Sequence, residues 1–486
     1  MAGQPKATGP RLLPTLRCLL VLAAAARAAA ELHFQPPLVI HSEFDPQSYW
    51  LIAENFQGRG GRDGGSGGTA THQLPSLITG SLNGPILWHV RSAGTSGARG
   101  SGGARDGARW ETFEIANLKG AVHAAPVDVN WDGLLDLIVA YAFGPGCPSD
   151  CSKDDGRLAY LENPGGEFGV AWRVVDIGKT RHPAHRVAVL NREDRARARI
   201  VGVPVAGVAD KSLDDPMYSP SEVFALSLPP LGAVHDPDAW RATERVVAAD
   251  LTICHDGRPW SGVLGGGGSD GAAAGARPHG AALLLACSQG LISYDFTTSD
   301  DGQRDEWRRI GEQAFTLDSD AKYKGLSSAV QIGESSFAFI GPYHGNTFGI
   351  STADGPPGSQ QQVVLKDVVG QGGHDVQLLA GADGVDHVIA AFRDEARGIY
   401  VYSPDQHGGK KGAAATGTLL PPADGSAAAW RRRKIYGGPV SMTAVADIDG
   451  DGLQDLASIN WGQKDDSSVV VHYQAAPPEP DHISEL

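Results

Sequence analysis

The sequence reads Asp128-Val-Asn-Trp-Asp-Gly-Leu-Leu-Asp136 in one place and Asp447-Ile-Asp-Gly-Asp-Gly-Leu-Gln-Asp455 in another, two copies of the pattern D-x-[DN]-x-D-G-x-x-D. Oxygen ligands on alternate residues of a tight loop, with glycine supplying the turn, suit a hard cation such as Ca²⁺ or Mg²⁺. An EF-hand would need a glutamate at loop position twelve, where Val139 and Ser458 stand, and helices instead of these strand-like flanks. We therefore expect each loop to bind a cation that braces a turn, with the ligands Asp128, Asn130, Asp132, Asp136, Asp447, Asp449, Asp451 and Asp455.

A second regularity is a tryptophan that opens a short strand-like segment. It occurs at Trp110, Trp172, Trp240, Trp307 and Trp430, at intervals of 62, 68, 67 and 123 residues. The last interval is about twice the others, and Gln361-Gln-Val-Val-Leu365 lies inside it as a degraded copy. Short β-rich runs separate these markers, and no amphipathic helix of about twelve residues or more is expected. A period of ~50 to 70 residues with several short strands in each unit predicts the blades of an all-β propeller.

The two ends of the chain are expected to supply a seventh blade. Phe34-Gln-Pro-Pro-Leu-Val-Ile40 looks like a further marker segment. If every marker is an outermost strand, the chain begins with one outer strand and ends with the three inner strands of the same blade, at about residues 438 to 474. Pairing of the termini then closes the ring and removes its exposed sheet edges. We predict a seven-bladed β-propeller over residues 31–474 with a short polar tail at 475–486, and flexible inter-strand insertions at the Gly-, Ala- and Ser-rich stretches 58–71, 93–109, 265–280 and 406–429.

Composition indicates an exported protein. Residues 1–30 combine basic residues, a short apolar run and a final run of small residues, the layout of a cleaved secretory signal. No later stretch approaches the ~18 apolar residues of a membrane span. The formal net charge of −15 disfavours nucleic acid and anionic membranes as partners. An even number of cysteines remains after the signal, which fits two disulfides with three possible pairings: Cys147, Cys151, Cys254 and Cys287.

Histidines recur at a fixed distance from the markers. His123, His185 and His374 each lie 13 residues after a marker, whereas the same step from Trp240 reaches Ile253, with His255 two residues later. Equal offsets in a repeated unit predict equal positions in different blades, near the mouth of the central channel. Imidazoles that converge there could bind Zn²⁺ or supply an acid and a base. The alternative is that they hydrogen-bond to water or backbone, as polar residues of propeller channels do.

Several segments resemble known families. The Asp-rich loops resemble the calcium loops of FG-GAP or VCBS propeller blades. From about residue 33 to 474 the chain resembles the N-terminal propeller of fungal aldos-2-ulose dehydratase, also described as 1,5-anhydro-D-fructose dehydratase. The segments that carry this second resemblance are Phe34-Gln-Pro-Pro-Leu-Val39, Arg157-Leu-Ala-Tyr-Leu-Glu-Asn-Pro164, His185-Arg-Val-Ala-Val189, Val201-Gly-Val-Pro-Val205 and His344-Gly-Asn-Thr347.

The resemblance implies a lyase that removes water from keto-sugars such as aldos-2-uloses or 1,5-anhydrofructose. It implies that His185 is a general base and that His344 meets ligand or metal. Removal of a proton beside a carbonyl and loss of a β-hydroxyl would follow, with a cation polarising the carbonyl oxygen. The remaining residues that we expect to contact the sugar are His123, His374, Asn346 and Tyr343.

A second hypothesis remains open beside the lyase. The family enzyme continues into cupin-type domains after its propeller, whereas this sequence ends at Leu486. The chain could instead be a non-catalytic module that binds carbohydrate or protein, for which a stable ring is enough. A small sugar or glycan is the expected partner under the first hypothesis. The fold by itself does not distinguish the two hypotheses.

Overall fold

The computed structural model describes most of the chain between Leu32 and Ala475, and structural statements below concern those residues. The expected signal at 1–30 and all of the expected tail except Ala475 lie outside them, as do the low-complexity stretches apart from Arg109 and 418–420. The described residues are 32–42, 47–57, 74–92, 109–165, 167–210, 212–260, 282–298, 305–315, 322–332, 336–352, 362–381, 385–404, 418–420, 430–462 and 467–475.

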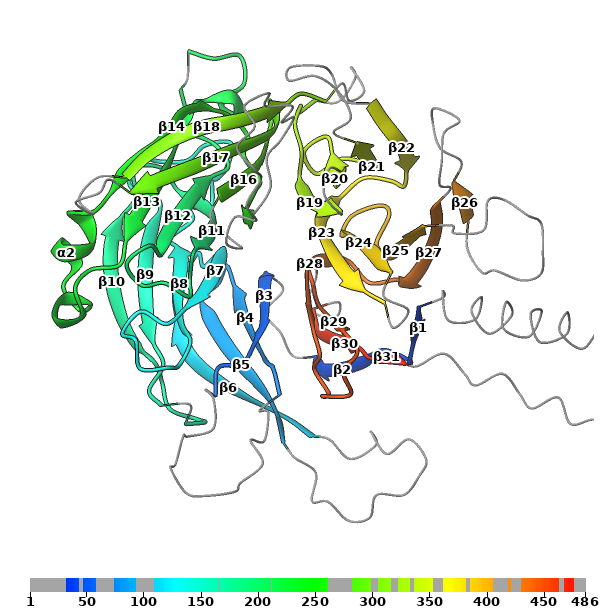
Figure 1. Cartoon of the computed structure of the whole chain (residues 1–486), viewed down its shortest axis with the longest axis horizontal. Coiled ribbons are helices and arrows are strands. Elements are labelled where there is room, and N and C mark those ends of the chain that lie inside the picture. Colours follow the sequence, from blue (N-terminus) through cyan, green and yellow to red (C-terminus); the bar gives the residue numbers. More distant parts are fainter. Residues whose placement is uncertain are drawn as a thin grey trace, which may run out of the picture.

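The described strands form seven antiparallel blades arranged around a centre and one further two-stranded sheet, so the predicted seven-bladed all-β propeller is confirmed (Figure 1). From inner to outer strand, the first three blades are β3 to β6 (Ser48–Glu54, Ser76–Ser81, Pro85–Ser92, Arg109–Asn117), β7 to β10 (His123–Val127, Asp136–Tyr141, Arg157–Glu162, Arg173–Lys179) and β11 to β14 (Ala184–Leu190, Arg199–Pro204, Ser221–Ser227, Arg245–Leu251). The next three are β15 to β18 (Asp256–Trp260, Ala282–Cys287, Gly290–Thr298, Asp305–Gln313), β19 to β22 (Ser328–Ile332, Ser336–Gly341, Thr347–Thr352, Gln362–Val368) and β23, β24, β25, β27 and β26 (Gly373–Ala380, Asp386–Phe392, Gly398–Pro404, Trp430–Tyr436, Thr418–Leu420).

The seventh blade joins the two ends of the chain as the sequence predicts. Its inner strands are β28 (Val440–Ala446), β29 (Asp455–Asn460) and β30 (Val469–His472), and its outer strand is β2 (Leu38–His41). In Figure 1 the blue N-terminal strand lies beside the red C-terminal strands. A further pairing, β1 (His33–Phe34) with β31 (Gln474–Ala475), extends the contact between the ends. The ring is therefore closed by backbone hydrogen bonds between residues more than 400 positions apart.

Most marker tryptophans lie at or beside the outer strands, as expected, with one exception. Trp240 belongs to the short helix α2 (Pro237–Arg241), and the outer strand β14 begins only at Arg245. Asp236 caps this helix by accepting a hydrogen bond from Asp238 N, and Pro237 fixes its first turn. The Trp240 indole is buried and donates to Val234 O. Among the described residues α2 is the only α-helix, and none of their helices could cross a membrane.

Apolar strand residues pack between neighbouring blades and form the core. One cluster spans the first three blades and includes Trp50, Trp88, Tyr160 and Trp240. Two disulfides add covalent links: Cys147 pairs with Cys151, and Cys254 with Cys287, which joins the start of β15 to the end of β16. This resolves the three pairings that the sequence left open.

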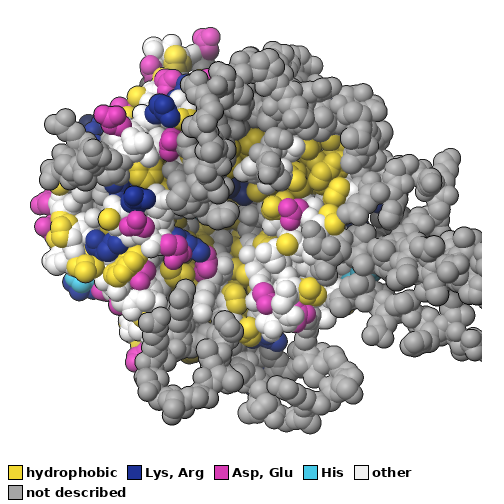
Figure 2. Space-filling view, viewed as in Figure 1, with side chains coloured by type: hydrophobic (Ala, Val, Ile, Leu, Met, Phe, Trp, Pro, Cys, Tyr) yellow, Lys and Arg dark blue, Asp and Glu magenta, His cyan; other side chains and the backbone are white. Residues whose placement is uncertain are grey.

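The outer surface carries both signs of charge. In Figure 2, acidic and basic side chains alternate over the described part of the face in view. Exposed ion pairs of the described residues include Arg157 with Asp176 and Arg181 with Glu222. Pairs of this kind contribute about 0 to 1 kcal/mol each, so the blades are held mainly by their apolar packing.

Candidate functional site

All seven innermost strands begin with the same backbone irregularity. In β11, Ala184 pairs with Pro204 and Arg186 with Val203, which leaves His185 as an extra residue. The pairing shifts in the same way around Tyr49, His374 and Ser441. In the other three blades the residue just before the strand plays this part. Its amide donates to the carbonyl of the residue that pairs with the first residue of the strand, so two consecutive residues face one partner. We call these residues the bulge ring: Tyr49, Val122, His185, His255, Ser327, His374 and Ser441.

The residues one position later form a second ring, and part of it lines a pocket in the channel. The second ring consists of Trp50, His123, Arg186, Asp256, Ser328, Asp375 and Met442. The pocket has a volume of about 500 Å³ and is lined by His123, Asp256 and Met442 together with apolar residues such as Val187 and Leu51. A β-bulge turns the following side chains to new directions, which separates the surroundings of the two rings.

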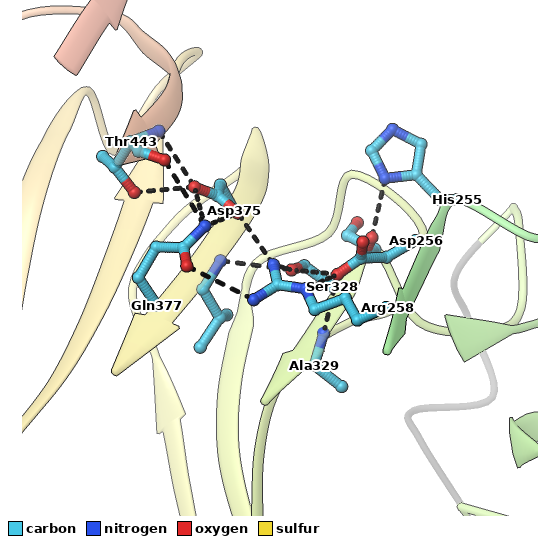
Figure 3. Close-up of polar contacts among 10 residues, drawn as sticks. His255, Asp256, Arg258, Ser328, Ala329, Asp375, Gln377 and Thr443 are labelled. Carbon is cyan, nitrogen blue, oxygen red and sulfur yellow. Dashed lines mark hydrogen bonds and ion pairs between the residues drawn. The ribbon is translucent and has the colours of Figure 1, made fainter. Parts of the chain in front are cut away.

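A buried ionic network crosses the channel at the level of the second ring (Figure 3). Arg258 donates to Asp256 at 2.8 Å, to Ser328 at 2.9 Å and to Asp375 at 3.0 Å. The other oxygen of Asp375 accepts from both the amide and the hydroxyl of Thr443. Burial raises the pKa of Asp256. The charges of Arg258 and Arg186 and the hydrogen bond from Ser328 together outweigh this effect, so the net pKa lies below the ordinary value. The network links strands β15, β19, β23 and β28 and holds two carboxylates around one guanidinium.

Four imidazoles are in contact at the bulge-ring end of the channel. We call His185, His255, His344 and His374 the histidine cluster. The ring centroid of His255 lies 4.6 Å from that of His185, 4.7 Å from that of His344 and 4.9 Å from that of His374. His185, His255 and His374 are at most 3% exposed. The cluster therefore collects residues from four blades around one buried point.

Tyr49 and two arginines complete the surroundings of the cluster. The Tyr49 hydroxyl lies 2.8 Å from His185 Nε2 and 3.2 Å from His374 Nε2. Arg186 Nη1 donates to His185 Nδ1 at 3.2 Å, and Arg393 Nη2 donates to His344 Nδ1 at 3.1 Å. Each of these nitrogen acceptors must therefore be unprotonated.

The cluster is neutral at neutral pH. Burial, followed by the positive charges of Arg186 and Arg393 and of the other imidazoles, lowers the pKa of all four rings well below 6.5. His255 Nδ1 donates to Ser327 O at 2.7 Å, so its Nε2 keeps a lone pair. His344 Nε2 lies 3.0 Å from that nitrogen and donates to it. Neutral imidazoles with free lone pairs are the form that binds metal ions.

The donor set of three of these residues fits a metal ion. One nitrogen from each of His255, His344 and His374 lies within 4.8 Å of the other two. His374 Nδ1 is buried and has no hydrogen-bond partner in the described structure, which is a cost that a ligand would remove. A cation at this point would replace the hydrogen bond between His344 Nε2 and His255 Nε2, and the proton on His344 Nε2 would have to leave for that nitrogen to become a ligand. Imidazole nitrogens suit Zn²⁺ among the common cations.

The expected site residues divide between the two ends of the channel. His185, His344 and His374 belong to the cluster, and the ring of Tyr343 stacks on that of His344 at 4.1 Å. His123 lies in the second ring, where its Nδ1 accepts from Val187 N and its side chain lines the pocket. Asn346 accepts from the Thr347 hydroxyl, and no contact of its side chain with the cluster is found in the described structure.

Sequence analysis missed several members of the site. His255 takes the bulge-ring position although its offset is two residues longer, because the marker Trp240 lies in helix α2 ahead of the strand. Val122, not His123, is the bulge residue of its blade. No periodicity pointed to Tyr49 or to Arg186 and Arg393, since their roles follow from side-chain contacts between blades. Counting positions from the start of each inner strand, instead of from the marker tryptophan, would have identified His255.

The two Asp-rich loops lie at equivalent places, between the first and second strands of their blades. In loop 128–136, Asp128 accepts from Asp132 N and Gly133 N, and Asp132 accepts from Leu134 N. In loop 447–455, Asp447 accepts from Gly450 N and Gly452 N, and Asp451 accepts from Leu453 N. Oxygen atoms of Asp447, Asp449 and Asp455 lie within 4.8 Å of one another. These tight loops present carboxylate oxygens, which are the ligands that hard cations prefer.

The last aspartate of each loop is buried and ties the loop to its blade. Asp136 accepts from Val129 N and Asn163 N, and Asp455 accepts from Ile448 N and Gln474 N. Burial raises the pKa of both carboxyl groups to about 7. Each therefore connects the loop to the end of the third strand, β9 or β30.

Comparisons with known proteins do not assign a family. No protein-family model matches the sequence, and no significant match to a curated protein is found. Among solved structures, Sqt1 of Chaetomium thermophilum, crystallised with the N-terminus of ribosomal protein L10, aligns over 88% of this chain and 86% of its own. The TM-score is 0.41 and the identity 13%. None of these comparisons confirms the resemblance to aldos-2-ulose dehydratase, which stays a prediction.

Proposed function

We propose that this protein is a binding propeller that takes a small oxygen-rich ligand, a sugar or the end of a glycan, at the bulge-ring end of its channel. The observation that carries the proposal is the histidine cluster, in which three neutral imidazoles share one buried point. His255, His344 and His374 would hold a divalent cation, with Zn²⁺ the best match to their nitrogen donors. A cation there supplies an electrophile for a carbonyl or hydroxyl oxygen of the ligand.

Residues of this chain would orient such a ligand without help from another domain. Tyr49 presents a hydroxyl between His185 and His374, and Tyr343 presents an aromatic face stacked on His344. Sugars are bound by this combination of hydroxyl-matching polar groups and an apolar ring face. The Asp-rich loops would bind Ca²⁺ or Mg²⁺ separately and stabilise two blades.

The test is metal and sugar binding by purified protein. Zinc titrated into metal-free protein should bind with one-site stoichiometry by calorimetry, and His374→Gln should weaken it by about 10- to 100-fold or more. His89→Gln is the matched control. His89 is also buried, but it lies on β5 of the first blade, where its ring forms hydrogen bonds with Thr79 and Thr112. Zinc binding that is the same in both variants would refute the cluster as the metal site.

Lyase activity is the second candidate function, and the contact of Tyr49 with two imidazoles favours it. His185 Nδ1, its unprotonated nitrogen, could take a proton from the carbon beside a carbonyl once the ligand displaces Arg186 Nη1. The proton on His185 Nε2 could pass through the Tyr49 hydroxyl to His374. The β-hydroxyl would leave with a proton as water, and a carbon–carbon double bond would form. Incubation with 1,5-anhydrofructose or 2-keto-sugars, followed by ultraviolet absorbance, tests this. Absence of product with metal-loaded protein would leave the binding function alone.

A further inference from the structure

Of two arginines at the histidine cluster, Arg186 has no carboxylate partner among the described residues and Arg393 has only the half-exposed Asp394. Arg186 is only 4% exposed, and no carboxylate of the described residues lies within ion-pair distance of it. Within the described structure its Nη1 donates hydrogen bonds to His185 alone, to the ring nitrogens and the carbonyl oxygen. A buried guanidinium of this kind is costly because neutral acceptors replace its hydration only in part.

Arg393 is similarly poor in acidic partners. Its Nη2 donates to His344, and its Nε lies 3.8 Å from Asp394, a residue whose side chain is 51% exposed. The guanidinium lies over the Trp461 ring at 5.4 Å. The charges of Arg186 and Arg393 both lower the pKa of His255, so both act on the same point of the channel.

The acidic groups of the ionic network form no ion pair with either arginine, although the charge of Arg186 helps to lower the pKa of Asp256. Asp256 and Asp375 are bound to Arg258, Ser328 and Thr443, as Figure 3 shows. The four imidazoles are neutral, so the cluster end of the channel carries two positive charges in a protein whose net charge is −15. Arg258 shows the usual arrangement, with two carboxylates for one guanidinium. Arg186, which has no carboxylate partner among the described residues, and Arg393, whose only carboxylate partner there is the half-exposed Asp394, thus differ from Arg258.

We propose that the ligand of this site carries an oxyanion, a carboxylate or a phosphate, which Arg186 and Arg393 bind. The inference rests on the proposed function for the position of the site and adds the charge of the ligand. The planar fork of a guanidinium matches the oxygens of a carboxylate or phosphate and forms two hydrogen bonds with it. Sugars that carry such a group, uronic acids or sugar phosphates, satisfy both the oxyanion donors and the hydroxyl-binding residues.

A cation at the cluster and the anion would assist each other. Two guanidinium groups beside His255 and His344 repel a divalent cation, and an oxyanion cancels this repulsion. Each ligand should therefore raise the affinity of the other by the same factor. Neutral sugars would lack this coupling.

Calorimetry with three probes tests the charge requirement. D-glucuronate, D-glucose 6-phosphate and neutral D-glucose are titrated into the full chain, with zinc or with EDTA. We expect at least one anionic probe to bind at least about tenfold more tightly than glucose, and to lose affinity as salt rises. The anionic probe that binds better identifies the oxyanion as carboxylate or phosphate. Equal affinity for all three probes, or no binding of either anion, would overturn the inference.

Two variants separate a ligand-binding role of Arg186 from a structural one. Arg186→Met should reduce the affinity for the anionic probe at least about tenfold while the melting temperature without ligand stays equal or rises, because a buried charge without a carboxylate is removed. Arg432→Met is the matched control, since Arg432 also lies over a tyrosine ring, Tyr400, but pairs with Asp367. It should melt at a lower temperature and bind the probe as before.

The outcomes distinguish the inference from the proposed function. Anion binding that depends on Arg186 but not on zinc would support the charge requirement and refute its coupling to a metal at the histidine cluster. Zinc-dependent binding of the anionic probe that is unchanged in Arg186→Met would support the proposed function and refute the inference. A lower melting temperature of Arg186→Met with unchanged affinity would show that the arginine is structural.

Discussion

Trp131 and Gly450 occupy the same place in the two Asp-rich loops, and both have a left-handed backbone. Their φ angles are 61° and 79°, and the glycines two positions later, Gly133 and Gly452, have φ of 92° and 90°. The loop thus imposes a conformation at its fourth position that costs an L-residue about 1–2 kcal/mol. Trp131 tolerates this with a side chain that is 46% exposed.

Exchange of these residues should change stability in opposite directions. Gly450→Ala should lower the free energy of unfolding by about 1–2 kcal/mol because alanine is strained in the left-handed region. Trp131→Gly should leave it equal or raise it slightly, since strain relief exceeds the entropic cost of glycine. Urea unfolding followed by fluorescence measures both. Equal stability of Gly450→Ala and the parent would show that the loop adapts without strain.

Buried neutral histidines give the fold an acid sensitivity. Burial lowers the pKa of His472 to about 4, so below pH 6.5 the unfolded chain binds a proton that the folded chain does not. The contribution of His472 is therefore present at neutral pH and is lost as the pH falls from about 6.5 toward 4. Between pH 7 and 5 the loss should be about 2 kcal/mol.

His472→Gln isolates this effect. The free energy of unfolding of the variant should fall less steeply with acid than that of the parent, by about 2 kcal/mol between pH 7 and 5. Denaturant unfolding at several pH values in one buffer series gives the difference. Parallel curves for the two proteins would mean that His472 does not titrate on unfolding in this range.

At the scale of elements, the β-bulge decides which side chains reach the site. The sequence offset correctly marked His185 and His374, which are the extra residues of β11 and β23. The same offset marked His123, one position beyond the bulge residue Val122. A shift of one residue changes the direction of a strand side chain, and bulges leave no trace in composition. The strands of the site were therefore predictable, whereas its exact members required the register.

The Asp-rich loops should make stability depend on calcium. A cation bound only by the folded state stabilises it by RT ln(1 + [L]/Kd), which is about 2.7 kcal/mol at a hundredfold excess over Kd. Calcium should therefore raise the melting temperature, and chelation with EGTA should lower it. The double variant Asp128→Asn, Asp447→Asn should lose most of this response because each loop loses a carboxylate.

Asp194→Asn is the control for the loop variants. Asp194 lies in the corresponding turn of the third blade, where it accepts from Ala196 N, but the neighbouring loop lacks the other acidic positions. Its variant should respond to calcium like the parent. A calcium response that survives in the double variant would place the stabilising ion elsewhere.

At the scale of the whole molecule, the ring could be predicted because a closed array repeats one unit. Markers near the outer strands and the pairing of the two termini follow from a period that the sequence displays, and the structure confirms both. The arginines of the channel could not be predicted in this way. Arg186 and Arg393 belong to different blades, and their shared effect on His255 depends on side chains that meet only across the closed ring. The sequence repeat therefore predicts the propeller, whereas the site depends on residues that do not follow the repeat.

Closure by the N-terminal strand should control the stability of the entire ring. β2 pairs with β30 through Leu38 with Val471 and Val39 with Val470, and β1 pairs with β31. Deletion of residues 32–41 would expose the edge of β30 and open the ring. We expect a lower melting temperature and a greater tendency to aggregate, with the largest loss of amide protection in β28 to β30 by hydrogen exchange. A synthetic peptide of residues 32–42 should restore the melting temperature in a concentration-dependent way, and a scrambled peptide should not. Unchanged melting and exchange after the deletion would mean that six blades and three strands hold the ring without this pairing.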